Sequence, residues 1–222
     1  MSNIELVVFD WNGTLFNDVY TVVACDNIVL TTYNYSSVGI RKYRDNFRQP
    51  IIDHFEDLGF NRELFEQESD NIAQLFSYHY EKMALKCDLR WGAKKLLLEI
   101  ARQGKQSIIL SNHPAELIDI HLNRFKIKHL FSEISGNDNQ KICHFKLAKE
   151  DRLKNYLEKH EIDPQNVIII GDTIEEVEIG HNLGLYTAAI SNGFCSKSRL
   201  KVCQPDHLIT NLVQLIDIIN GG

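Results

Sequence analysis

Acidic and hydroxyl side chains stand at the ends of several short apolar runs. Asp10, Ser111 and Asp172 each come at or directly after such a run. In an open parallel sheet, ligands bind beyond the carboxyl ends of the strands, so we expect these three residues to meet at one edge. Two carboxylates from different strand ends can hold a hard cation such as Mg²⁺. A hydroxyl beside them can donate to a phosphoryl oxygen, so the spacing indicates phosphoryl chemistry.

The turn after Asp10 supports this interpretation. Gly13 lets the backbone approach a ligand closely, and main-chain N–H groups in such a turn can cradle anionic oxygens. Together with the second strand end, the turn gives a set of predicted phosphate-binding residues, which are Gly13, Thr14, Ser111 and Asn112.

The elements that must position these residues alternate along the chain. Continuous apolar runs at 4–9, 107–110, 167–170, 186–190 and 208–209 are typical of parallel strands buried on both faces. Helical patterns at 92–102, 115–125 and 150–160 separate several of them. Strand and helix in alternation predict an α/β fold with a Rossmann-like, doubly wound parallel sheet.

One region interrupts this alternation. Between 17 and 89 no strand pattern is evident, whereas Ile72, Phe76, Tyr80 and Met83 recur at helical spacing. We therefore predict a helical cap domain at 17–89, inserted after the first strand of a core domain formed by 1–16 and 90–222.

The composition excludes several classes of protein. The chain has 222 residues, a formal net charge of −6 and 44% hydrophobic residues, which excludes a disordered protein and disfavours non-specific binding to nucleic acid. No targeting or membrane-spanning pattern is evident. The five cysteines are scattered and form no CxxC pair, as expected for reduced thiols in the cytoplasm.

The ordered motifs resemble the haloacid dehalogenase superfamily. They read FDWNGTL at 9–15, IILSN at 108–112, then a lysine, and IIIGDTIEE at 168–176. The insert is similar to the helical, C1-type cap of the phosphoglycolate-phosphatase-like branch. The resemblance implies a Mg²⁺-dependent phosphohydrolase that acts on a small phosphorylated metabolite through an aspartyl-phosphate, as a monomer or homodimer.

The resemblance also implies roles for individual residues. Asp10 would be the nucleophile and Ser111 would bind the phosphoryl group. Asp172 would hold Mg²⁺ together with Asp10 and the backbone carbonyl of Asn12, and Glu176 would reach the metal through water.

The lysine of the third motif is open among three positions. Lys149 suits the pattern best because it opens a helix 22 positions before Gly171. Lys146 is the runner-up, and Lys141 is the third candidate.

Asn12 departs from the pattern of the phosphatases, which usually carry an aspartate there as general acid and base. An amide cannot exchange a proton usefully near neutral pH, and general acid–base catalysis is typically worth about 10²–10⁴-fold. Three explanations stay open. The substrate has a good leaving group, another residue such as His113 substitutes, or the protein is a slow or non-catalytic relative that binds phosphorylated metabolites.

A different reaction is the remaining alternative. Phosphonoacetaldehyde hydrolases, which cleave a C–P bond, also lack this aspartate and carry a tryptophan where Trp11 stands here. They need a cap lysine, for which Lys42 is a candidate. Lys42 belongs to a basic cluster with Arg41, Arg44 and Arg48, which is either a solvated face or, through Arg48, a contact to an anionic part of the substrate.

Overall fold

The computed structural model describes residues 4–137 and 149–221. Six parallel strands form one sheet in the order β3-β2-β1-β4-β5-β6. The strands are β1 (Leu6–Phe9), β2 (Gln106–Pro114), β3 (Glu133–Asn137), β4 (Val167–Gly171), β5 (Tyr186–Ile190) and β6 (His207–Ile209). The strand order reverses beside β1, which creates a crevice between the ends of β1 and β4. The predicted α/β fold with a doubly wound parallel sheet is confirmed.

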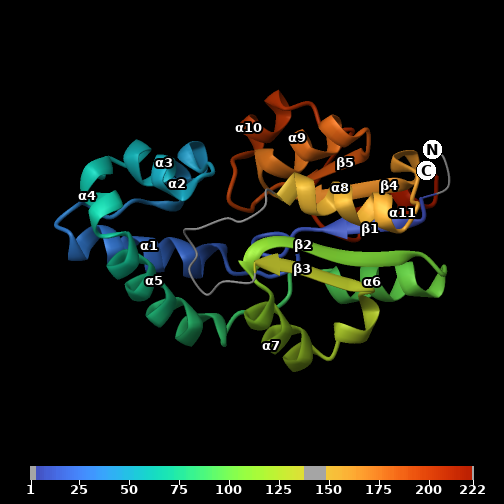
Figure 1. Ribbon diagram of the computed structural model, residues 1–222, viewed down its shortest axis with the longest axis horizontal. Helices are drawn as coiled ribbons and strands as arrows, with labels where there is room; N and C mark the ends of the chain where they lie inside the picture. Colours follow the sequence, from blue (N-terminus) through green and yellow to red (C-terminus); the bar gives the residue numbers. More distant parts are fainter. Residues whose placement is uncertain (1–3, 138–148, 222) are drawn as a thin grey trace.

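Helices cover both faces of the sheet because its strands are apolar on both faces. Val7 and Phe9 pack with α6 (Ala93–Arg102), α7 (Ala115–Phe125) and α11 (Gln214–Ile219). Leu6 and Val8 point the other way and pack with α8 (Lys149–Lys159) and α9 (Ile174–Leu183). Alternate residues of one strand thus serve two cores. Figure 1 shows α6 and α7 on one side of the strands and α8 and α9 on the other.

Five helices occupy the chain between β1 and α6. They are α1 (Val19–Thr32), α2 (Ile40–Asn46), α3 (Ile51–Asp57), α4 (Arg62–Gln67) and α5 (Ser69–Ala84). We call them the cap helices. They lie together to the left of the sheet in Figure 1 and pack around Tyr43, Phe55 and Phe65. The boundaries 17 and 89 of the cap stay a prediction.

The remaining elements are short. The helix α10 (Lys197–Val202) follows β5, and two 3₁₀ turns span Lys128–Leu130 and Pro164–Asn166. Within the described ranges, no helix combines the length and the apolar character that a bilayer crossing needs.

Two strand predictions were incomplete. The run at 107–110 does not end at Ser111, because β2 continues to Pro114 and pairs with Asn137 of β3 beyond an irregularity in register. The sequence pattern also missed β3 itself. Four of its five residues are half-buried at the sheet edge, and it includes a glycine and three polar side chains, so no apolar run marks the strand.

Candidate active site

Asp10 and Lys149 form a buried ion pair at the carboxyl edge of the sheet. Asp10 directly follows β1, and its backbone N–H donates to Ile170 of β4, which fixes its place at the crevice. Lys149 opens α8 and donates from Nζ to Oδ1 of Asp10 at 2.8 Å. The same ammonium group contacts Glu176 and lies 3.7 Å from Oε2 of Glu175. One cation therefore faces three carboxyl groups.

These contacts shift the pKa values of the pair. Burial raises the pKa of Asp10 well above its usual range, and the charge of Lys149 offsets part of this effect. For Lys149, burial alone would lower the pKa, but the charges of Asp10 and Glu176 more than compensate and raise it. The lysine is thus held as a cation beside the candidate nucleophile.

Asp172 follows β4 and is fixed from two sides. Its Oδ1 accepts from the Thr14 hydroxyl at 2.7 Å, and its Oδ2 accepts from the backbone N–H of Phe194 at 2.5 Å. Gly13 and Gly193 both lie so close that an added Cβ would overlap the Asp172 carboxylate. The backbone at Gly13 also has φ of 71°, which favours glycine. The turn after β1 thus orients the carboxylate of Asp172, which follows the neighbouring strand β4.

The donor set fits a hard divalent cation. Asp10 and Asp172 supply carboxylate oxygens from adjacent strand ends, and the negative charge there exceeds the single ammonium of Lys149. Oxygen ligands of this kind suit Mg²⁺, which usually keeps several waters and takes only one or two carboxylates. In the described part of the chain, no group of three or more His, Cys, Asp or Glu side chains is arranged as a metal cage. The Asn12 carbonyl as a further ligand stays a prediction.

Glu176 has a structural role as well as its predicted metal role. Thr173 and Glu176 form a capping box at the start of α9, in which Oε2 of Glu176 accepts from the Thr173 hydroxyl at 2.6 Å. Its other oxygen accepts from Lys149. The spacing of a threonine three residues before a glutamate is the sequence signal for such a box. A water-mediated contact to a metal stays a prediction.

Ser111 and Asn112 lie at the same edge and line the same cavity as Asp10. Neither side chain caps α7, whose N-cap is Pro114. The Ser111 hydroxyl accepts from the His113 N–H at 3.1 Å. Asn112 donates to Glu175 at 3.1 Å, which ties β2 to α9. Phosphate binding by both residues stays a prediction that this placement favours over a capping role.

Asn12 lies in a buried polar network that the sequence did not indicate. Its Nδ2 donates to Oδ2 of Asp18 at 2.6 Å and to the Tyr80 hydroxyl at 2.9 Å. The Tyr80 hydroxyl in turn donates to Oδ2 of Asp18 at 2.6 Å. Burial raises the pKa of Asp18, although hydrogen bonds from Tyr80 and Asn12 oppose this. The two contacts of Tyr80 span 62 and 68 residues, so no local pattern reveals them.

Asp18 also accepts the hydrogen bond of one N–H group that was predicted to bind phosphate. The N–H of Gly13 donates to Oδ1 of Asp18 at 2.9 Å, and the Thr14 hydroxyl is bonded to Asp172. These two groups therefore shape the turn. Arg90, which sequence reasoning did not single out, donates to the Gly13 carbonyl at 2.6 Å and to Ser191 at 2.8 Å. It joins the turn after β1 to the loop after β5.

His113 is not an exposed loop residue. It lies in β2, lines the cavity and packs edge-on against Tyr80, with ring centroids 5.4 Å apart. Burial and the charge of nearby His121 lower its pKa to about 3. The imidazole is therefore neutral near pH 7 and has no acidic proton to give.

Two predicted basic residues lie elsewhere. Arg48 donates to Asp57 at 2.7 and 3.0 Å and is 45% exposed. Lys42 is exposed on α2. Neither belongs to the described residues that line the cavity. Lys141 and Lys146 lie outside the described residues, whereas Lys149 occupies the place beside Asp10 that the third motif predicts.

A comparison of the sequence with known protein families supports the same site. The sequence profile of the family described as haloacid dehalogenase-like hydrolase matches residues 7–190. The chain belongs to this family. The matched segment includes Asp10, Ser111, Lys149 and Asp172, the four residues around which the site is built.

Similar members of the haloacid dehalogenase-like hydrolases match nearly the whole chain. A phosphoglycolate phosphatase of Vibrio cholerae is 25% identical over 99% of this chain and 98% of its own length. A phosphoglycolate phosphatase of Vibrio vulnificus is 24% identical over 97% of this chain and 96% of its own.

Solved structures agree on the fold. A predicted phosphatase from Clostridium acetobutylicum superposes with a TM-score of 0.82 at 17% identity, with all of both chains covered. A haloacid dehalogenase-like family protein from Streptococcus pneumoniae has a TM-score of 0.81 at 20% identity and covers 98% of this chain and 99% of its own.

Proposed function

We propose that the protein is a Mg²⁺-dependent phosphohydrolase that acts on a small phosphorylated molecule. One contact carries the proposal. The buried Lys149 ammonium lies 2.8 Å from Asp10, at the sheet edge where the buried Asp172 also lies. The curated relatives that match the full chain are phosphatases, which supports the same reaction class.

Each residue has a defined part in the proposed reaction. An oxygen of Asp10 attacks phosphorus, the P–O bond to the leaving group breaks, and an aspartyl-phosphate forms. Lys149 balances charge on the transferring phosphoryl oxygens, and Ser111 donates a hydrogen bond to one of them. Asp10, Asp172 and the Asn12 carbonyl would hold Mg²⁺, which would offset the charge of the phosphoryl group. Water then attacks the same phosphorus and releases phosphate and free Asp10.

Phosphate release from acetyl phosphate tests this proposal. Acetyl phosphate is small and has a weakly basic leaving group, so it needs no general acid. We expect turnover in the presence of Mg²⁺, loss of turnover with EDTA, and loss of at least 10³-fold in Asp10→Asn. Acid-quenched protein exposed to acetyl [³²P]phosphate should carry label that hydroxylamine removes. Equal activity of Asp10→Asn and wild type, or no activity of folded wild type, would overturn the proposal.

The alternative C–P bond hydrolase finds no support in the described residues. That reaction needs a cap lysine, and among the described lining residues the only lysine is Lys149, which comes from α8. A non-catalytic binding protein is the outcome that the acetyl phosphate assay would reveal, as ligand binding without phosphate release.

A further inference from the structure

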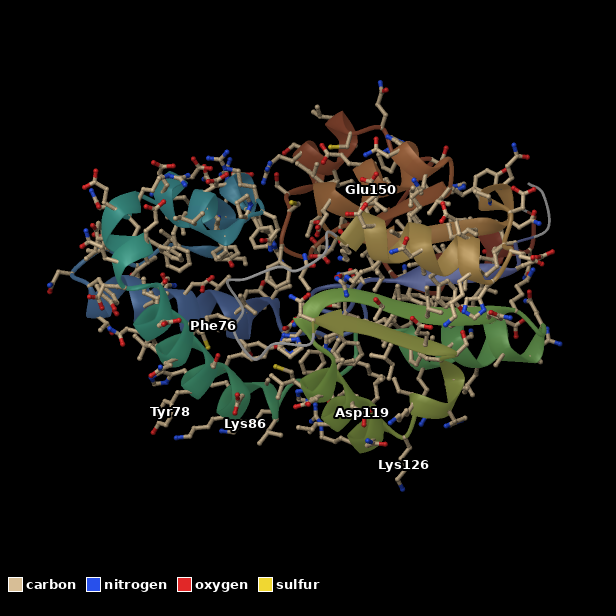
Figure 2. The ribbon with its side chains drawn as sticks, in the orientation of Figure 1. Phe76, Tyr78, Lys86, Asp119, Lys126 and Glu150 are labelled. Atoms are coloured by element: carbon tan, nitrogen blue, oxygen red, sulfur yellow. The ribbon has the colours of Figure 1, made fainter. Side chains whose placement is uncertain are left out.

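The cavity beside Asp10 is lined largely by hydrocarbon side chains of the cap helices. Its volume is about 160 Å³. The cap contributes large apolar groups from all five helices or their ends, including Val29, Phe47, Phe55, Phe65, Ile72 and Phe76. Figure 2 shows Tyr78 on the outer side of α5, pointing away from the molecule, whereas Phe76 lies on the side of that helix that faces the cap interior. An apolar cavity of roughly 150 Å³ is large enough to hold a benzene ring.

The cap adds hydrogen-bonding groups to this cavity but no cation. Its polar lining groups are Asp26, Tyr43, Gln49 and Tyr80. Within the described ranges, no arginine or lysine of the cap helices is a lining residue. Arg44 is used elsewhere, since it donates to the carbonyls of Gly193 at 2.7 Å and Asn192 at 2.8 Å.

This lining disfavours a substrate with a charged tail. A carboxylate placed among these described side chains of the cap would lose its hydration without meeting a cation of the cap helices, which is unfavourable. A phosphorylated carboxylic acid such as phosphoglycolate therefore fits the cavity poorly. An uncharged apolar group fits it well, because burial of apolar surface is favourable.

The leaving oxygen is constrained by a separate observation. The Asn12 amide cannot transfer a proton to a leaving group near neutral pH. It donates its two Nδ2 hydrogen bonds to Asp18 and Tyr80. The Tyr80 proton is engaged by Asp18, and His113 is neutral near pH 7. None of these three described side chains therefore provides a proton to the leaving oxygen, and we expect the leaving group to depart as an anion. A phenolate, with a conjugate acid of pKa about 10, departs far more readily than an alkoxide, whose conjugate acid resembles water at about 16.

We propose that the substrate is an aryl phosphate, the phosphate ester of a phenol whose ring carries no charge. This inference rests on the proposed phosphohydrolase function and specifies its substrate class. The ring lies among the apolar side chains of the cap, and the phosphate lies beside Asp10 and Lys149. An Asp10 oxygen forms the new bond to phosphorus while the bond from phosphorus to the phenolic oxygen breaks. The electron pair stays on that oxygen as phenolate, which takes a proton from water. A second water attacks phosphorus and yields hydrogen phosphate and Asp10.

A matched panel of substrates tests the proposal. It compares phenyl phosphate, propyl phosphate and phosphoglycolate, with acetyl phosphate as the reference for basic phosphohydrolase activity. We expect kcat/KM for phenyl phosphate to exceed that for each of the other two esters by at least 100-fold. If acetyl phosphate is hydrolysed but phosphoglycolate is used as well as phenyl phosphate, the aryl phosphate proposal is overturned and the phosphohydrolase function stands. If acetyl phosphate is not hydrolysed either, both proposals fail.

A binding measurement gives a readout without turnover. Calorimetry with Mg²⁺ present compares benzylphosphonate, which has an apolar ring, with phosphonoacetate, which has a carboxylate tail. We expect benzylphosphonate to bind at least ten-fold more tightly. Equal or tighter binding of phosphonoacetate would contradict the proposal.

Two leucine substitutions on α5 test whether the aromatic ring of the substrate binds in the cavity. Ala73 lines the cavity and Gln74 beside it is exposed. Ala73→Leu fills the space for the ring, so kcat/KM for phenyl phosphate should fall at least ten-fold more than kcat/KM for acetyl phosphate. Gln74→Leu adds the same side chain outside the cavity and should leave that ratio unchanged. Equal behaviour of the two variants would place the ring elsewhere and overturn the proposal.

Discussion

The side-chain amide of Asn12 donates to the carboxylate of Asp18 at a distance of 2.6 Å. Asn12 lines the cavity, whereas Asp18 is wholly buried. The residue that departs from the phosphatase pattern is therefore held by an acidic partner behind it. This relationship determines what a substitution at position 12 would do.

Asn12→Asp should convert the site to one that accepts poor leaving groups. Two carboxyl groups at this separation cannot both ionise easily, so the pair would retain a proton near neutral pH. That proton is available to a leaving alkoxide. We expect kcat/KM for propyl phosphate to rise by about 10²-fold, with little change for phenyl phosphate, which needs no acid. Asn12→Ala is the control, since it removes the amide without adding an acid. A gain of equal size on both esters would contradict this explanation.

Lys149→Met should damage both stability and activity. The substitution leaves Asp10 and Glu176 buried without their cation, and breaking a buried pair in this way costs about 3–5 kcal/mol. Turnover of acetyl phosphate should fall by about 10²–10³-fold in the protein that remains folded. Urea unfolding and phosphate release measure the two effects. Lys154→Met, at an exposed position of α8, is the matched control and should change neither.

Gly193→Ala should disable the site through Asp172 alone. An added Cβ would overlap the Asp172 side chain, which cannot move away without losing its bonds to Thr14 and Phe194. A displacement of about 1 Å at a reacting centre costs about 10²-fold in rate. We expect a loss of this size in kcat/KM and a higher Mg²⁺ concentration for half-maximal rate. Gly39→Ala, where an added Cβ meets open space, should behave as wild type. Normal Mg²⁺ dependence in Gly193→Ala would refute the expectation.

Asp26→Asn should change how stability depends on pH. Burial raises the pKa of Asp26 to about 7, and the hydrogen bond from Tyr43 only partly offsets this. An unfolded aspartate has a pKa near 3.9, so between pH 4 and 7 the folded protein binds more protons than the unfolded one. Stability therefore falls as pH rises through this range.

The asparagine variant lacks this loss while it still accepts the Tyr43 hydrogen bond. Each pKa unit corresponds to about 1.4 kcal/mol, so at pH 8 we expect the variant to be more stable than wild type by up to about 4 kcal/mol. At pH 4 the two should differ little. Urea unfolding across this pH range provides the measurement, with the exposed Asp45→Asn as control. Parallel stability curves for wild type and Asp26→Asn would exclude the effect.

The sequence was informative where short segments determine geometry. Asp10, Ser111 and Asp172 could be predicted to meet because each follows an apolar run of the sequence, and parallel strands end at one edge. Lys149 was preferred among three lysines because it opens a helix and suits the spacing of the resembled family, and the structure puts its ammonium on Asp10.

The rest depends on packing between segments that are distant in sequence. The Asp18 and Tyr80 partners of Asn12 come from either end of the cap, and only the packing of α1 on α5 brings them together. The cavity lining has the same origin. Phe47, Phe65 and Phe76 follow the same apolar pattern as core residues, and only the folded cap shows that their side chains surround a space. The edge strand β3 lacked a signal because its side chains are only half-buried.

The contact of Arg44 with the loop after β5 has a kinetic consequence. Arg44 of the cap holds the carbonyls of Asn192 and Gly193, and the next residue, Phe194, holds Asp172 through its N–H. Any outward swing of α2 therefore pulls on the backbone that aligns this carboxylate. Opening of the cap to release a product would therefore also displace the Asp172 carboxylate, so the open form of the enzyme would be less active. In the proposed reaction, this coupling would shield the aspartyl-phosphate from bulk water and would make release of the phenol the slowest step of the cycle.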